Sequence, residues 1–303
     1  MTNRRAVVIG LWAAALCGGP LASLAAAQGQ GHAYGHYKKS GQSGSDAASS
    51  AATQVQPSGT GARNFGSWLD DASVLEPGGA SVSLGFSYWR TPGYREFDAP
   101  VVDGGLGIAN RVQFGFSVPY YHASEPGGPV SRGLGDLFFT TKVQLRDPMD
   151  NDARLGLAVT PIIEVLSYAP APDSSRLQWA IPVSLELQRA RWRVYGSTGY
   201  FSRGAVFGSA AFEFSLSDRA AVTGSMSRSH SLKTDELATA LGLSQSRTDV
   251  TGGVSVALTP RTALFGAIGS TISTRDFNST TLGLTTGVAF FFDGWTLPTT
   301  RRR

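Results

Sequence analysis

The chain has 303 residues, 42% of them hydrophobic, with 37 glycines, one cysteine and a formal net charge of +4. The positive charge belongs to the two ends, because residues 63–300 hold 19 basic and 21 acidic side chains, a net charge of −2 that excludes a nucleic-acid partner. The one cysteine, Cys17, precedes residue 28, so the exported chain is expected to have no disulfide, catalytic thiolate or cysteine-bound metal.

A secretory signal peptide is predicted over residues 1–27. Arg4 and Arg5 precede an apolar run that Pro20 interrupts, and the run ends in three alanines before Gln28. A basic start, a short apolar centre and a small-residue end are typical of a cleaved signal, whereas the interruption argues against a membrane-spanning helix. We therefore expect export of the mature chain from the cytoplasm.

A disordered arm is predicted over residues 28–62, which are rich in Gly, Ser and Gln and poor in apolar side chains. His32 and His36 lie in this arm. Two histidines in a flexible polar tract are more often ordinary polar residues than ligands, so no metal site is expected.

Residues 80–292 alternate apolar side chains with polar or small ones. In 177–188, LQWAIPVSLELQ, every second residue from Leu177 to Leu187 is apolar, and the residues between them are mostly polar or small. Successive side chains of a β-strand point to opposite faces, so this pattern predicts strands with one apolar and one hydrophilic face.

Three features favour apolar faces that turn outward to lipid rather than inward to a soluble core. The apolar faces continue for about ten residues, the length that a tilted strand needs to cross a bilayer. The opposite faces are rich in Gly, Ser, Thr and Ala, and short connections alternate with longer ones. The sequence therefore predicts an all-β protein, a transmembrane antiparallel up-and-down β-barrel over 80–292.

About twelve strands are expected, and an even number places both chain ends on the periplasmic side of an outer membrane. The narrow bore of such a barrel leaves room for the pre-barrel segment 63–79, RNFGSWLDDASVLEPGG, to plug it in part. The predicted strands are roughly 80–89, 100–109, 111–121, 134–146, 153–165, 177–188, 191–201, 204–216, 220–230, 248–258, 262–272 and 280–292.

The last predicted strand ends in TTGVAFFF, with Thr285, Gly287, Phe290 and Phe292 at fixed spacing. This spacing resembles the signal that the outer-membrane barrel assembly machinery recognises, so that machinery is an expected partner. The C-terminal tail 293–303 departs from the pattern, because such barrels usually stop at the aromatic residue.

A glycine motif connects the third and fourth predicted strands. NRVQFGFSVPYY is followed by a loop and by GLGDLFFTTKVQL, which contains Gly133, Gly135 and Asp136. A phosphate-binding glycine loop needs a helix after it, whereas the residues after Asp136 alternate as a strand, so a nucleotide site is rejected.

Together these stretches resemble an outer-membrane β-barrel family associated with meta-pathway phenol degradation. The resemblance covers about residues 65–292. It implies a barrel in the outer membrane of a Gram-negative bacterium and uptake of small, often hydrophobic molecules.

Charged residues on the hydrophilic faces are expected to line the lumen, because a charge on the lipid face costs about 2–4 kcal/mol at the bilayer midplane. They either select solutes or only form ion pairs that fill the interior. The candidates are Asp103, Asp136, Lys142, Arg154, Glu164, Glu186, Arg193 and Glu213.

Three functions remain open. A channel or transporter for small molecules, hydrophobic or aromatic ones included, is favoured over a closed structural or adhesive barrel and over an outer-membrane hydrolase. Neither an enzymatic activity nor a cofactor is expected, and the partners are outer-membrane lipid, lipopolysaccharide and an unidentified solute. A hydrolase would use polar residues near the outer rim, namely His122, Ser229, His230, Ser231 and Asp235.

Overall fold

The computed structural model describes residues 68–124, 130–148, 153–167, 176–202, 204–233, 244–273, 276 and 279–292. The signal peptide (1–27), the arm (28–62) and the tail (293–303) predicted from the sequence lie outside these residues. Within the described segments, no helix has the length and apolar character of a membrane span.

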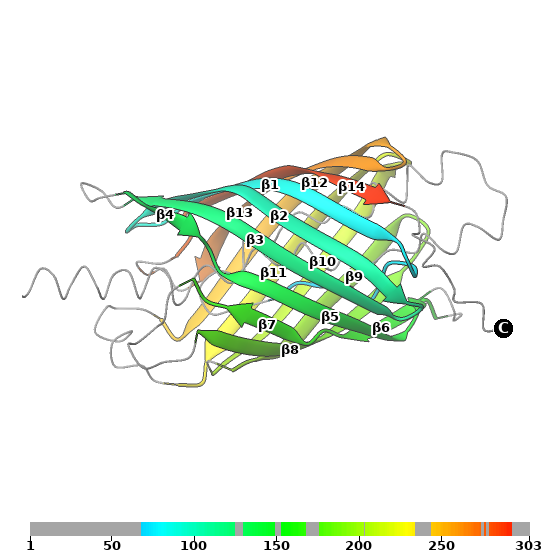
Figure 1. Cartoon of the computed structure of the whole chain (residues 1–303), viewed down its shortest axis with the longest axis horizontal. Helices are drawn as coiled ribbons and strands as arrows, with labels where there is room; N and C mark the ends of the chain where they lie inside the picture. The colour runs from blue at the N-terminus through cyan, green and yellow to red at the C-terminus, as the bar shows by residue number, and fades with distance from the viewer. Residues whose placement is uncertain are drawn as a thin grey trace, which may run out of the picture.

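A single antiparallel sheet closes on itself to form a barrel of strongly tilted strands (Figure 1). The seam joins the first strand to the last, with Ala80 opposite Phe292 and Arg90 opposite Leu282. Closure leaves no free edge along these two strands. The described strands are β1 (Ala80–Arg90), β2 (Arg95–Ala109), β3 (Val112–Ser124), β4 (Val130–Leu134), β5 (Leu137–Arg146), β6 (Leu155–Val159), β7 (Ile162–Val165), β8 (Leu177–Gln188), β9 (Trp192–Phe201), β10 (Ala205–Ser217), β11 (Ala220–Ser231), β12 (Ser246–Thr259), β13 (Thr262–Ser273) and β14 (Leu282–Phe292).

The fourteen described strands occupy the twelve positions around the wall that the sequence predicts, because two of the positions are each shared by a pair of short strands. Both β4 and β5 pair with β3, and both β6 and β7 lie between β5 and β8. Pro161 interrupts the second pair because it has no N–H to donate to the ladder. Its carbonyl still accepts a hydrogen bond from the backbone N of Thr141 at 3.0 Å, so the wall stays connected.

Apolar side chains face outward and polar ones face inward. On β8, Trp179 and Leu185 are 48% and 53% exposed, whereas Ser184 and Glu186 between and beside them are buried. This is the reverse of a soluble protein, and burial of a large apolar side chain in lipid is worth about 1.5–3 kcal/mol. The predicted all-β transmembrane barrel is therefore confirmed as the fold.

Residues 68–79, here called the inner segment, enter the barrel before β1 begins. Trp68, Asp71 and Leu75 are all buried inside the ring of strands. The segment leaves the lumen beside β2, where the N of Gly78 donates to the O of Gly107 at 2.7 Å. Gly78 has a φ of 79°, a left-handed conformation that favours glycine, and it turns the chain into β1.

Candidate functional site: the polar network in the lumen

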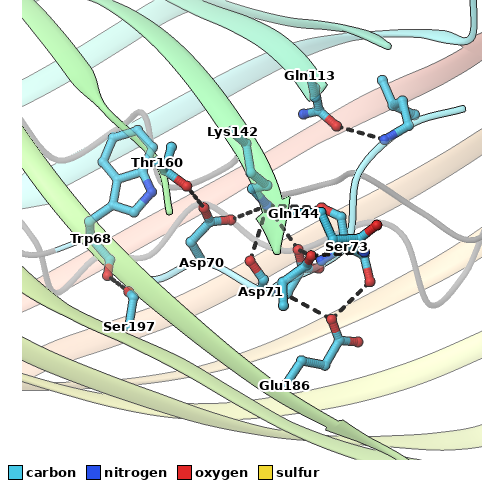
Figure 2. A network of polar contacts seen from close by, with 12 residues as sticks. Trp68, Asp70, Asp71, Ser73, Gln113, Lys142, Gln144, Thr160, Glu186 and Ser197 are labelled. Carbon is cyan, nitrogen blue, oxygen red and sulfur yellow. Dashed lines mark hydrogen bonds and ion pairs between the residues drawn. The ribbon is translucent and has the colours of Figure 1, made fainter. Parts of the chain in front are cut away.

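Lys142 on β5 holds the inner segment from one side of the lumen (Figure 2). Its Nζ lies 2.7 Å from Asp70 Oδ1 and 3.0 Å from Asp71 Oδ1. The same Nζ donates to the backbone O of Asp71 and of Ser73, each at 3.1 Å. One ammonium group, with three N–H donors, thus contacts four acceptors of the inner segment, and Lys142 itself is only 2% exposed.

Arg193 on β9 holds the same segment from another part of the wall. Its Nη1 lies 3.1 Å from Asp71 Oδ2 and 3.6 Å from Glu186 Oε1. Its Nε and Nη2 donate to the two carboxylate oxygens of Glu213 at 3.1 and 3.0 Å. Glu213 is the cross-strand neighbour of Arg193 on β10, so this bidentate pair also ties the wall together.

Hydrogen bonds from hydroxyl and amide groups continue the attachment along the segment (Figure 2). Thr160 donates to Asp70 at 3.0 Å, and Ser73 donates to Glu186 at 2.8 Å. Gln113 accepts from the N of Leu75 at 2.8 Å, and further toward the start of the segment the carbonyl of Trp68 accepts from the hydroxyls of Ser197 and Ser209. The contacts come from β3, β5, β8, β9 and β10, so the inner segment bridges the bore rather than lying along one strand.

The network contains more carboxyl groups than cations. Asp70, Asp71, Glu186 and Glu213 surround Lys142 and Arg193. Burial raises the pKa of Asp71 to about 7, and repulsion from Glu186 and Asp70 acts in the same direction, while Lys142 and Arg193 oppose the shift. A proton on one carboxyl group would therefore relieve the excess negative charge.

An apolar cluster surrounds Trp68, where the inner segment begins. Its ring lies 6.3 Å from that of Phe138, and the two planes are tilted by 44°. The Nε1 of Trp68 is buried and has no hydrogen-bond partner among the described residues. The lumen is therefore polar around Lys142 and apolar around Trp68, and the cluster comprises Trp68, Phe138, Ile162, Ala180, Phe201, Ala205 and Phe207.

The sequence-predicted charged residues divide into two groups. Lys142, Glu186, Arg193 and Glu213 meet in the network around the inner segment, and all four are buried. The structure does not bring the other four into it. Asp103 accepts hydrogen bonds from Ser117 at 2.6 Å and from Ser83 at 3.0 Å, and Asp136 accepts one from the backbone N of Ser167 at 2.7 Å. Glu164 is buried on β7. Arg154 is exposed in the turn before β6 and has a φ of 54°.

The residues of the two predicted motifs lie in the wall. Gly135 stands at the break between β4 and β5, where a Cβ would come within 2.8 Å of the Pro119 ring and its N donates to the Pro119 carbonyl. On β14, Thr285 faces inward and Phe292 outward, and Phe290 is the register partner of Val82 across the seam. Gly287 lets β14 approach Phe265 on β13 closely.

The inner segment supplied the site residues that were not singled out from the sequence. Trp68, Asp70 and Asp71 stand in the predicted plug segment, whereas the charged candidates predicted from the sequence all lie at or after residue 103. The signal that could have found them is an adjacent acidic pair directly after an apolar Trp-Leu, in a chain with Lys142 and Arg193 at inward-facing strand positions.

Ser229 and His230, two of the hydrolase candidates, do not form a nucleophile–base pair. Ser229 is buried and faces the lumen, whereas the adjacent His230 is exposed on the outer side of β11. His230 Nδ1 lies 2.7 Å from the hydroxyl of Ser246. A nucleophile and its base must lie within hydrogen-bond reach, and side chains on opposite faces of one strand do not. Asp235 lies outside the described residues.

Gly107→Val is expected to displace the inner segment from the bore. A Cβ at this position would lie 1.9 Å from the carbonyl O of Glu76 and 2.6 Å from that of Leu75. We expect amide hydrogen exchange in residues 68–79 to become about tenfold faster or more, as in a locally opened segment. Gly224→Val is the control, because a Cβ there meets nothing within 4 Å. Unchanged exchange in Gly107→Val would contradict this close contact.

No protein-family model and no curated protein matches the sequence. The fold is similar to that of an outer membrane channel from Pseudomonas putida F1, with a TM-score of 0.57 and 12% identity over 73% of this chain and 98% of that chain. Comparison with the NanC porin gives a TM-score of 0.49 and 8% identity over 69% of this chain and 98% of that one. Comparison with the KdgM porin gives a TM-score of 0.49 and 7% identity over 69% of this chain and 99% of that chain. At such identities the likeness to the Pseudomonas channel shows the fold alone.

Proposed function

We propose that the protein is a channel for small hydrophobic or aromatic molecules in the outer membrane of a Gram-negative bacterium, and that the inner segment gates it. The outward apolar faces and the closed barrel support a membrane location. The fold, shared with an outer membrane channel, supports the outer membrane in particular. In this proposal the barrel is exported, inserted by the barrel assembly machinery and surrounded by lipopolysaccharide.

The attachment of the inner segment carries the proposal. Among the residues that the structure describes, the segment is bound to the wall through contacts that involve side chains, chiefly those of Lys142 and Arg193, until it reaches Gly107. The strands of the wall also pair with one another around the ring, independently of this segment. The segment can therefore leave the bore without breaking the barrel, which is what a gate requires and what a purely structural core does not.

The apolar cluster around Trp68 supports an uncharged aromatic solute. Phe138, Phe201 and Phe207 offer ring faces and edges, and aromatic pairs of this kind are favourable beyond their buried area. The free indole N–H of Trp68 can donate to a phenolic oxygen. Phenol is therefore the proposed solute, in agreement with the resemblance to barrels of meta-pathway phenol degradation.

The test is uptake of labelled phenol and toluene by intact cells that produce the wild-type protein, the Trp68→Phe variant or no barrel. We expect the wild type to accelerate uptake of both compounds. Trp68→Phe keeps an aromatic ring but loses the N–H, so it should slow phenol about three- to tenfold, the value of one neutral hydrogen bond, and leave toluene unchanged.

Two outcomes would contradict the proposal in different ways. Equal uptake of both compounds with and without the protein would favour a closed structural or adhesive barrel. Equal slowing of phenol and toluene by Trp68→Phe would retain the channel but remove the N–H from solute recognition.

A further inference from the structure

A groove of about 520 Å³ lies on the outer surface of the barrel across β8, β9, β10 and β11. Leu185 and Met226 stand on either side of it and are 53% and 54% exposed. Its floor is formed by small outward-facing residues of β9 and β10, among them Gly196, Gly208 and Ala210. Ligand sites in proteins commonly have volumes of about 300–1,000 Å³, so the groove is large enough for part of a lipid.

Strand register explains why the surface is hollow here. One row across the four strands places Leu185 opposite Gly196, Gly196 opposite Ala210, and Ala210 opposite Met226. The order is large, small, small, large, so two small residues lie between two long apolar side chains. In the next row, Gly208 is the small residue, and its neighbours are Thr198 with Val183 on one side and Arg228 on the other.

Arg228 gives the groove a charged end. It is exposed on the outer side of β11, three residues before the last residue of that strand, Ser231. It makes no hydrogen bond or ion pair with any residue that the structure describes. A lipid-facing arginine is costly at the bilayer midplane and much less so near the interface, so its guanidinium belongs at the level of the lipid headgroups.

The direction of β11 decides which leaflet this is. The connection before β11 is a short turn at 218–219, whereas the one after it runs from 232 to 245. Short turns lie on the periplasmic side of outer-membrane barrels and longer loops on the extracellular side. Arg228 therefore lies toward the outer leaflet, whose phosphorylated lipid is the lipid A part of lipopolysaccharide.

We propose that this groove binds one molecule of lipid A, with a phosphate on Arg228 and one acyl chain along the row of small residues. Guanidinium and phosphate form short, charge-assisted and often bidentate hydrogen bonds. The apolar floor and walls match a saturated chain, and Gly196, Gly208 and Ala210 let the chain lie against the backbone. The inference rests on the outer-membrane location of the proposed function but not on transport.

The test is native mass spectrometry of the mature protein in detergent, titrated with purified lipid A. Gly208→Leu fills the floor without a clash, because a Cβ at Gly208 meets nothing within 4 Å. Arg228→Gln removes the cation. We expect each change to weaken lipid A binding about tenfold, the loss of one charge-assisted contact or of a few buried methylene groups.

Two matched variants are expected to bind lipid A like the wild type. Gly224→Leu adds the same side chain at an equally open, outward-facing position on β11 that does not line the groove. Arg132→Gln removes another exposed arginine, on β4.

Either of two results would overturn the proposal. The first is equal binding of lipid A by all five proteins. The second is a dimer that Gly208→Leu dissociates and Gly224→Leu does not, because a second copy of the chain would then occupy the groove. Lipid A binding without any solute uptake would retain this site and count only against the channel.

Discussion

Lys142→Met is expected to increase the fraction of time that the channel conducts, by about a hundredfold. The ammonium group contacts four acceptors of the inner segment, and methionine has similar length but no donor. Removal of one partner of a buried ion pair costs about 3–5 kcal/mol, and we use the lower end because the bore admits water once the segment moves. Each 1.4 kcal/mol changes the equilibrium between docked and released segment about tenfold.

Single-channel recording in planar bilayers measures this change. Lys233→Met is the matched control, because Lys233 is an exposed lysine after β11. A mature chain without residues 28–79 sets the upper limit of conductance. If that deletion conducts no better than the wild type, the inner segment is not the gate. If the deletion conducts better but Lys142→Met conducts like the wild type, contacts other than those of Lys142 hold the gate closed.

Arg193→Met is expected to lower the free energy of unfolding by about 3–5 kcal/mol. Arg193 neutralises Glu213 beside it on the next strand and also lies against Asp71 and Glu186. Its removal leaves three buried carboxyl groups near one another with only Lys142 nearby, and an uncompensated buried charge is strongly destabilising. The loss of the guanidinium from above the Tyr195 ring, 4.7 Å from its centroid, adds a smaller amount.

Denaturant unfolding in detergent micelles measures the change from the shift of the midpoint at constant slope. Arg191→Met, at an exposed arginine two residues earlier, should have little effect. The double variant Arg193→Met with Glu213→Gln should recover part of the loss, because it removes one of the stranded charges. A double variant less stable than Arg193→Met alone would contradict the role assigned to the pair.

Strand positions and faces could be predicted because both follow from the period-two pattern of single segments. The predicted 177–188 coincides with β8, and its odd positions face outward. The predicted start of β2 at residue 100 is wrong, because the strand begins at Arg95. The charged residues in this part of the strand obscure its strand pattern in the sequence. Glu96 and Asp98 are buried on the inner side, while Phe97 faces outward.

Partners inside the barrel could not be predicted in the same way. Alternation indicates that Arg193 and Glu213 face the same side, but only hairpin register makes them neighbours. Lys142 pairs with Asp70 and Asp71, which lie on no strand at all, so no strand pattern connects them. Such contacts depend on where a non-strand segment crosses the bore, which periodicity does not encode.

The seam between β1 and β14 has a consequence for folding. Its paired residues stand at opposite ends of the barrel sequence, so among the described strand pairings those that complete the ring have the greatest sequence separation. Non-local pairing is slow because the chain must lose loop entropy before any contact forms. Until β14 arrives, β1 presents an open edge that can join another chain. The inner segment is directly continuous with that edge, so its contacts with Lys142 and Arg193 can form before the last strand closes the ring.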